Sequence, residues 1–231
     1  MISITLLHWI ILWGLAFLAF YLIYAYWRNF YFFRDPVRKT PKNTKIVSPA
    51  DGKIVYITEI KNNQIPISIK GNKSIELVDV FKSGIKFKKG ILIGIFLSPF
   101  DIHYQRSPIS GKVRDIWYHK SKVNYSMLIM WLRIKFNIRP FYKASEHIIE
   151  NERNIMHVKN KEFDCFIVQI ADKLVNKIDC YVKKDNKVRI GQKIGMIRFG
   201  SQVDLFIPNM KKEMLKIKED AKTLAGITRF Y

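Results

Sequence analysis

The chain has 231 residues, 48% of them hydrophobic, and carries 40 Lys and Arg against 19 Asp and Glu, a net charge of +21. This composition excludes a disordered polypeptide, and the length beyond residue 27 allows one domain with a sizeable core. The charge favours an anionic partner, either nucleic acid or a lipid surface, although the abundance of Lys, Ile and Asn also fits drift in an AT-rich genome. Because no recognition motif of a nucleic-acid module is present, we expect no nucleic-acid partner.

Residues 2–27 contain no Lys, Arg, Asp or Glu. A helix of this length would measure about 39 Å, enough to cross a hydrocarbon core of about 30 Å. A cleaved signal peptide is disfavoured because there is no charged leading region and no clear cleavage site. We predict a membrane anchor helix over 1–29, either spanning or interfacial, followed by one domain over 30–231. Aromatic residues lie mainly toward the two ends of the segment, as in membrane helices: Trp9, Trp13, Tyr21, Tyr24, Tyr26 and Trp27.

Four cations follow this segment: Arg28, Arg34, Arg38 and Lys39. Positive residues next to a membrane helix stay on the cytoplasmic side. We therefore expect the protein at the cell (cytoplasmic) membrane, with the large domain inside.

From about residue 44 onward, short apolar runs alternate with Gly, Pro and Asn, which is typical of half-buried strands. The clearest predicted strands cover residues 53–60, 90–97, 163–170 and 187–197, and the best helix candidates after the anchor cover 143–154 and 210–221. The predicted fold is a mainly β (α+β) single domain with few short helices, preceded by a hydrophobic membrane helix.

Residues 127–142 mix large apolar side chains with Arg133, Lys135 and Arg139. This pattern fits a patch that dips into lipid while its cations meet head groups. It fits a core strand, or a helix plus loop, equally well. The two cysteines, Cys165 and Cys180, form no CxxC or metal-ligand pattern, so we expect two buried thiols in a reducing compartment and no metal.

Three short motifs carry groups that could do chemistry. The run SPADG at 48–52 contains Asp51, the run FLSPFDIHYQRSP at 96–108 contains His103, and Gly200 precedes Ser201. A serine is a weak nucleophile until a base takes its proton, and a carboxylate can orient that base. Asp51, His103 and Ser201 could fill these roles, although each motif alone is weak and the first also fits a plain turn.

The chain resembles the phosphatidylserine decarboxylase family, most closely its short, single-domain branch. The matching motifs run in order along the chain: FFRDPVR at 32–38, SPADG at 48–52, LSPFDIH at 97–103 continuing through RSPISG at 106–111, KAS at 143–145, ENERN at 150–154 and GMIRFGS at 195–201.

The resemblance implies a self-processing, pyruvoyl-dependent decarboxylase that turns phosphatidylserine into phosphatidylethanolamine and carbon dioxide. Ser201 would attack the carbonyl of Gly200, with His103 as the base and Asp51 holding its ring. The chain would split into a β chain of residues 1–200 and an α chain of 201–231, which would remain together as a heterodimer. Ser201 would become the covalent pyruvoyl cofactor, which draws electrons from the substrate's α-carbon.

The longer bacterial relatives have a second histidine three residues after the first, where this chain has Arg106, as in the short branch. Arg106 is therefore a candidate for gripping the substrate's phosphate or carboxylate, and His103 could serve both cleavage and decarboxylation. The sequence leaves open the decarboxylation of a related serine lipid such as archaetidylserine, a non-catalytic membrane-anchored binding protein of the same fold, and a higher homo-oligomer.

Overall fold

The computed structural model describes residues 4–65, 75–82, 85–173, 177–198 and 200–231. Residues 1–3 of the predicted anchor and Phe199 of the last motif lie outside the described residues. The chain forms two compact units, Met1–Pro36 and Val37–Tyr231.

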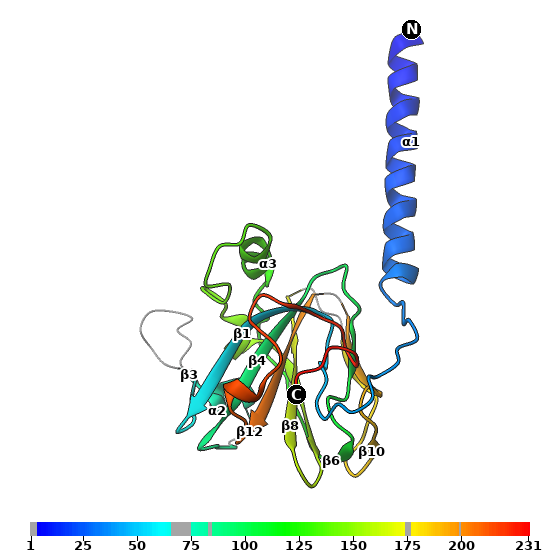
Figure 1. The fold of residues 1–231 in the computed structure, drawn as a ribbon. Helices are drawn as coiled ribbons and strands as arrows, with labels where there is room; N and C mark the ends of the chain where they lie inside the picture. The colour runs from blue at the N-terminus through cyan, green and yellow to red at the C-terminus, as the bar shows by residue number, and fades with distance from the viewer. Residues whose placement is uncertain (1–3, 66–74, 83–84, 174–176, 199) are drawn as a thin grey trace. The chain divides into compact units, whose positions relative to one another are not determined.

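The first unit is helical (Figure 1). Helix α1 covers Ile4–Tyr26 and continues into a π-helical turn, η1, over Trp27–Tyr31. Within Thr5–Tyr31, an 18-residue window reaches a mean hydropathy of 2.2 and is not buried inside the structure. The predicted apolar N-terminal helix is therefore confirmed, and its length and composition suit it to cross a membrane.

The second unit is built mainly from antiparallel strands. They are β1 Gly52–Lys61, β2 Gln64–Ile65, β3 Ile75–Glu76, β4 Lys89–Leu97, β5 Tyr104–Arg106, β6 Gly111–His119, β7 Arg153–Lys159, β8 Asp164–Ala171, β9 Ile178–Cys180, β10 Lys187–Val188, β11 Lys193–Ile197, β12 Ser201–Pro208 and β13 Lys222–Thr223. The described helices of this unit are short: α2 Leu77–Phe81, α3 Leu128–Lys135, α4 His147–Glu150 and the 3-10 turn η2 Lys212–Met214.

Most strands join one large sheet in the order β10-β6-β7-β8-β12-β4-β1-β2-β3, with β13 also pairing with β1 (Figure 1). Strands β5, β11 and β9 form a second, smaller sheet. Strand β12 thus lies inside the large sheet, bonded to β8 on one side and β4 on the other.

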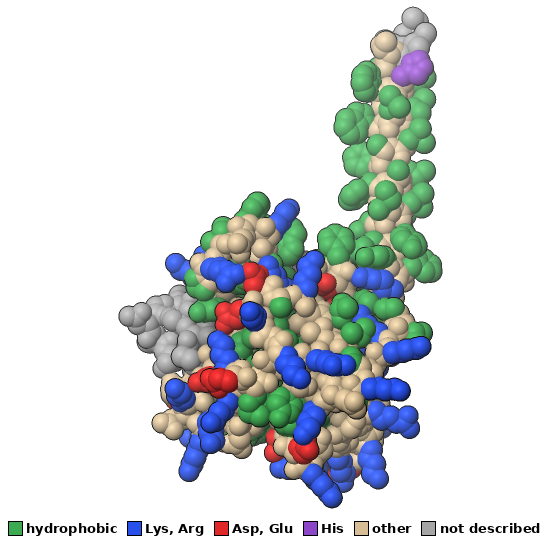
Figure 2. All heavy atoms as spheres, viewed as in Figure 1, with side chains coloured by type: hydrophobic (Ala, Val, Ile, Leu, Met, Phe, Trp, Pro, Cys, Tyr) green, Lys and Arg blue, Asp and Glu red, His purple; other side chains and the backbone are tan. Residues whose placement is uncertain are grey.

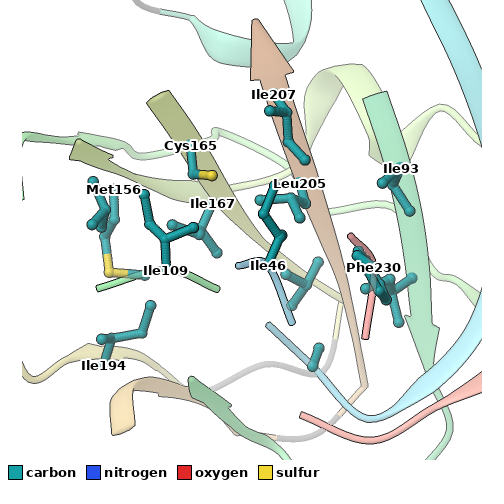
Figure 3. Packing of buried hydrophobic residues seen from close by; sticks show 14 of the residues in the cluster. Ile46, Ile93, Ile109, Met156, Cys165, Ile167, Ile194, Leu205, Ile207 and Phe230 are labelled. Atoms are coloured by element: carbon teal, nitrogen blue, oxygen red, sulfur yellow. The ribbon is translucent and has the colours of Figure 1, made fainter. Parts of the chain in front are cut away.

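Alternation along β12 sends its side chains to the two faces of the large sheet. Val203, Leu205 and Ile207 join a first hydrophobic cluster that includes residues of β11 and of the C-terminal segment, and Figure 3 shows its packing around Ile167. Phe206 joins a second cluster, which includes side chains from α2, α3 and α4. Each face of the sheet is therefore covered by a different layer.

The expected fold class, mainly β with few short helices, is confirmed. Strands β1, β4 and β8 match the predicted segments, whereas 187–197 divides into β10 and β11 around Gly191, whose φ of +77° makes a turn. Both helices predicted after the anchor are largely wrong: 143–154 contains only the four-residue α4 and then enters β7, and 210–221 contains only η2. Of the two cysteines, Cys165 is buried as expected, but Cys180 is exposed.

Candidate active site

The register of the sheet brings the predicted residues to one end of the domain. Phe96 of β4 pairs with Lys53 of β1 on one side and with Gln202 of β12 on the other. The start of β1, the end of β4 and the start of β12 therefore coincide. Asp51 precedes β1 and Ser201 opens β12, so both lie at this end.

Ser201 is held on both sides by the sheet, pairing with Leu97 and with Ala171. Its side chain is fully buried, and its Oγ has no hydrogen-bond partner among the described residues. Gly200 has a φ of +60°, and its carbonyl oxygen accepts a hydrogen bond from the backbone N–H of Asp172 at 3.3 Å. The bond between Gly200 and Ser201 is thus fixed at the first residue of an interior strand.

His103 follows β4 and is fully buried. Its carbonyl accepts a bond from the N–H of Ile197 at 3.3 Å, which places it beside the segment leading to Gly200. Its Nδ1 lies 2.9 Å from the carbonyl oxygen of Asp101. A carbonyl only accepts, so Nδ1 carries the proton, and in the neutral ring Nε2 keeps the lone pair that a base needs.

A series of hydrogen bonds between buried side-chain amides holds the backbone of His103 in place. The side chain of Gln105 donates to the His103 carbonyl at 2.9 Å and accepts from Gln169 of β8 at 2.8 Å. Gln169 in turn accepts from Asn154 of β7 at 2.8 Å. The loop carrying the histidine is therefore bonded to two strands of the large sheet.

The sequence predicted that Asp51 holds the His103 ring, but in the part of the chain that the structure describes its carboxylate bonds Arg38 and Ala225. Its carboxylate receives both ends of the Arg38 guanidinium at 2.5 and 2.7 Å, and the N–H of Ala225 at 2.8 Å. Arg38 also donates to the Ala225 carbonyl at 2.8 Å, and the side chains of this ion pair are only 6% exposed. Because Arg38 and Asp51 also bond the two backbone groups of Ala225, this pair ties the start of β1 to the C-terminal segment.

A pocket of about 260 Å³ opens beside the Gly200–Ser201 bond. Gly200 and Asp172 line it together with mostly apolar residues. Asp172 also accepts the backbone N–H of Met127 at 3.0 Å, and burial raises the pKa of its carboxyl group. The rest of the lining is Phe96, Leu97, Pro99, Ser126, Met127, Leu128 and Trp131.

Arg106 donates to the carbonyl of Gly191 at 3.0 Å and is not among the described residues that line this pocket. Its assignment to the substrate stays a prediction. Two residues with contacts at this end, Arg38 and Asp172, were not assigned to the site from the sequence. Arg38 lies in the motif FFRDPVR, which could have marked it as a site residue. Asp172 only follows a predicted strand, and no motif marks it.

Comparison of the sequence with known proteins assigns the chain to a family. A family model described as phosphatidylserine decarboxylase matches residues 27–230. Proteins named phosphatidylserine decarboxylase proenzyme from Pelagibacter ubique, Prosthecochloris aestuarii and Carboxydothermus hydrogenoformans are 34%, 32% and 30% identical to this chain. The alignments cover 86%, 87% and 86% of this chain, and 77%, 75% and 76% of the relatives. The match takes in β1 to β12 and every motif of the site, and the chain therefore belongs to the phosphatidylserine decarboxylase family.

Proposed function

We propose that this chain is an enzyme of phospholipid biosynthesis that decarboxylates phosphatidylserine to phosphatidylethanolamine and carbon dioxide. The substrate follows from the names of its relatives, which match over most of their length. Those names do not favour archaetidylserine or a non-catalytic binding role. The apolar helix α1 suits a protein whose substrate resides in a membrane.

The observation that carries the proposal is the Ser201 hydroxyl, which is fully buried and lacks a hydrogen-bond partner among the described side chains and backbone. Leaving a buried hydroxyl unsatisfied costs about 1–3 kcal/mol, so such a group calls for an explanation. Self-cleavage supplies one, because the hydroxyl is adjacent to the carbonyl that it would attack. The word proenzyme in the relatives' names agrees with a precursor that is processed.

In the proposed cleavage, Ser201 Oγ bonds to the carbonyl carbon of Gly200 as His103 takes the hydroxyl proton. The peptide C–N bond then breaks and its nitrogen gains a proton, which leaves an ester. Loss of the α-proton of Ser201 expels the Gly200 carboxylate, and water replaces the nitrogen, which departs as ammonia. The products are a β chain of residues 1–200 and an α chain of 201–231 that begins with a pyruvoyl group.

His103 and Asp172 would assist this step in different ways. The carbonyl of Asp101 accepts from His103 Nδ1, so Nε2 is the nitrogen that can take up a proton in the neutral ring. The Asp172 N–H already bonds the Gly200 oxygen, where negative charge would develop during attack. Asp51 lies at the same end but binds Arg38, so we assign it to positioning rather than to proton transfer.

A pyruvoyl group fits position 201, because it has the same three carbons as the serine that is already buried there at the start of β12. Such a group supplies a ketone that withdraws electrons from the α-carbon of an amine substrate. Arg106 would bind the anionic head group, as suits a planar guanidinium, and His103 would return a proton to the product. We place the catalytic unit on the cytoplasmic side of the cell membrane, from the cations after the anchor.

Mass spectrometry of the intact protein tests this proposal. We expect two fragments, 1–200 and 201–231, with the smaller one blocked at its N-terminus by a pyruvoyl group. Ser201→Ala should stay uncut and inactive, while Ser201→Cys, which keeps a nucleophile, should still be cut.

The matched control is Ser121→Ala, which removes an unrelated hydroxyl that donates to the Val123 carbonyl at 2.8 Å and should not affect cleavage. A wild-type chain that remains whole after membrane expression would overturn the proposed self-cleavage. Decarboxylation by Ser201→Ala would overturn the pyruvoyl assignment.

A further inference from the structure

The segment between β6 and α4 has an unusual charge distribution. Residues 116–145 contain no Asp or Glu, yet they carry six Lys or Arg: Lys120, Lys122, Arg133, Lys135, Arg139 and Lys143. The first and last of these residues flank α3 and its loops, so the positive charge is concentrated on one projection of the domain. Such a surface attracts anionic partners.

Helix α3 has an apolar side that the protein does not cover. Met130 packs into the second hydrophobic cluster, and Trp131 and Ile134 pack against it. The opposite side of the helix and the turn after it remain in solvent with large apolar side chains: Leu128 (54% exposed), Ile129 (52%), Leu132 (38%), Phe136 (64%) and Ile138 (50%). Contiguous exposed apolar groups mark a surface that binds a membrane or a partner.

Cations lie among these apolar side chains. Arg133 and Lys135 are on α3 itself, and Arg139 is on the turn that follows. Figure 2 shows hydrophobic and basic side chains gathered together over α3, which Figure 1 shows raised above one end of the strands. Apolar groups interspersed with Lys and Arg are the composition of interfacial helices, whose cations meet lipid head groups while the apolar groups enter the bilayer boundary.

This surface is continuous with the candidate active site. Leu128 and Trp131 of α3 line the pocket that also contains Gly200 and Asp172. Trp131 further lines a second pocket of about 410 Å³, which includes Lys135. A lipid at the exposed side of α3 would therefore be a short distance from the scissile bond.

The base of α3 is fastened to the same region. Asp172 accepts the N–H of Met127 through its side chain and donates to the Gly200 carbonyl through its backbone. Asn151 bonds both the N–H and the carbonyl of Tyr125, at 2.7 and 2.8 Å, and the carbonyl of Ala171 at 2.6 Å. Hydrogen bonds therefore fix the chain just before α3 next to the candidate active site, while the opposite side of the helix is exposed.

We propose that a docking surface formed by α3 and its following turn seats the catalytic unit on an anionic bilayer and passes lipid from it to position 201. We define this docking surface as Leu128, Ile129, Leu132, Arg133, Lys135, Phe136, Ile138 and Arg139. The bilayer is favoured over a protein partner because residues 116–145 contain cations and no acids. Asp220 pairs with Arg139, so the charge offered to head groups rests mainly on Arg133 and Lys135. The delivery of substrate rests on the proposed function, whereas bilayer contact does not.

Depth measurements on the full chain test the contact directly. Leu132→Cys carries a fluorescent probe in a Cys180→Ser background, which removes the exposed native thiol. The protein is reconstituted in vesicles of equal parts phosphatidylglycerol and phosphatidylcholine. We expect spin-labelled lipids to quench this probe but not a probe at Lys61→Cys, an 82%-exposed position at the far end of β1.

A Leu132 probe that aqueous quenchers reach as readily as the Lys61 probe would overturn bilayer docking. Shielding that grows with protein concentration, without quenching by labelled lipid, would show that a second copy covers the surface and would overturn it as well. The measurement can be repeated in Ser201→Ala, so its result does not depend on cleavage or decarboxylation.

Activity tests the delivery of lipid. Ile129→Glu/Phe136→Glu should be cut normally after Gly200, and should decarboxylate water-soluble dihexanoyl phosphatidylserine within about twofold of wild type, yet lose at least about tenfold on long-chain substrate in vesicles. Met214→Glu, a matched change at another exposed apolar residue, should leave both activities unchanged. Equal losses on both substrates would overturn delivery by this surface, whereas an uncut wild type would count against the proposed function alone.

Discussion

At the scale of single residues, the candidate cleavage bond depends on a backbone conformation that suits glycine. Gly200 has a φ of +60°, in the left-handed region that side chains disfavour. A Cβ at this position would lie 2.6 Å from Oδ2 and 3.1 Å from Cβ of Asp172. The same Asp172 donates its N–H to the Gly200 carbonyl, so the missing side chain lets the proposed oxyanion donor approach.

We predict that Gly200→Ala slows self-cleavage. The left-handed conformation costs an alanine roughly 1–2 kcal/mol, and the contact with Asp172 adds to this. A backbone shift that relieves the left-handed strain and the contact with Asp172 would move the Gly200 carbonyl away from Ser201 Oγ and from the Asp172 N–H. We expect a cleavage rate lower by roughly tenfold or more, measured as the appearance of the 201–231 fragment in freshly translated protein.

Removal of the clashing carboxylate provides the control for this prediction. Gly200→Ala should slow cleavage by a smaller factor in an Asp172→Ala background than in the wild type. The closest contact is then gone, while the left-handed strain remains. Cleavage of Gly200→Ala at the wild-type rate would contradict the role given to this backbone position.

At the scale of elements, strand β12 carries a polar cluster on the face opposite Ser201. Gln202 donates to Tyr56 Oη at 2.8 Å and to Asp204 Oδ1 at 2.7 Å, and Tyr56 donates to Asp204 Oδ2 at 2.7 Å. His147 of α4 bonds Gln202 at 3.1 Å. These four side chains are buried, so the residues just after the cleavage point are fixed by hydrogen bonds as well as by the sheet.

Burial in this cluster raises the pKa of Asp204 to about 6, although bonds from Gln202 and Tyr56 oppose the shift. The folded state therefore binds this proton more tightly than the unfolded state does. The resulting stabilisation is complete below the unfolded pKa near 4 and is lost as the pH rises through about 6. A shift of about two pKa units corresponds to about 3 kcal/mol in the free energy of unfolding.

Asp204→Asn should remove this pH dependence. The measurement is urea unfolding in mild detergent between about pH 4 and pH 7, and the stability of wild type relative to Asp204→Asn should fall by about 3 kcal/mol across that range. In Tyr56→Phe the carboxyl group loses a hydrogen bond that lowers its pKa, so the total loss of stability should be larger and extend to higher pH. Parallel pH profiles for wild type and Asp204→Asn would contradict the prediction.

Strands proved more predictable from the sequence than helices. Alternating β-branched residues gave β1, β4 and β8 close to their observed bounds. The segment 143–154 has a local helical pattern, but Arg153 donates to the carbonyl of Val80 at 2.8 Å, and Asn151 bonds Tyr125. These long-range partners draw the chain into β7, and no local propensity encodes them.

The candidate site divides in the same way. Gly200, Ser201 and His103 could be chosen from the sequence as candidates because they lie in contiguous motifs, and their catalytic roles stay predictions. The contact between Arg38 and Asp51 was not predicted, since Asp51 was expected to orient His103, a task that the Asp101 carbonyl performs. Backbone groups carry no residue identity, so a sequence motif cannot reveal them.

At the scale of the whole molecule, the segment that would become the α chain is built into the rest of the domain. Strand β12 lies between β4 and β8, and β13 pairs with β1. Near the C-terminus, the N–H of Phe230 donates to the Ile46 carbonyl at 2.8 Å, and Phe230 packs in the first hydrophobic cluster. Arg38 and Asp51 bind both backbone groups of Ala225.

We therefore predict that the two chains stay associated after cleavage. Removing residues 201–231 would leave the backbone of β4 and β8 unpaired at two new edges and expose apolar side chains of the first cluster to water (Figure 3). Both changes are energetically unfavourable. Native mass spectrometry in detergent should record the β and α chains in one particle, and a denaturing gel should separate them. The uncut Ser201→Ala serves as the control. Its native mass should differ from wild type only by the oxygen that the substitution removes and by the exchange of ammonia for water on cleavage, and it should yield a single band. Loss of the 201–231 fragment during native purification would contradict an α chain held by the interior of the sheet.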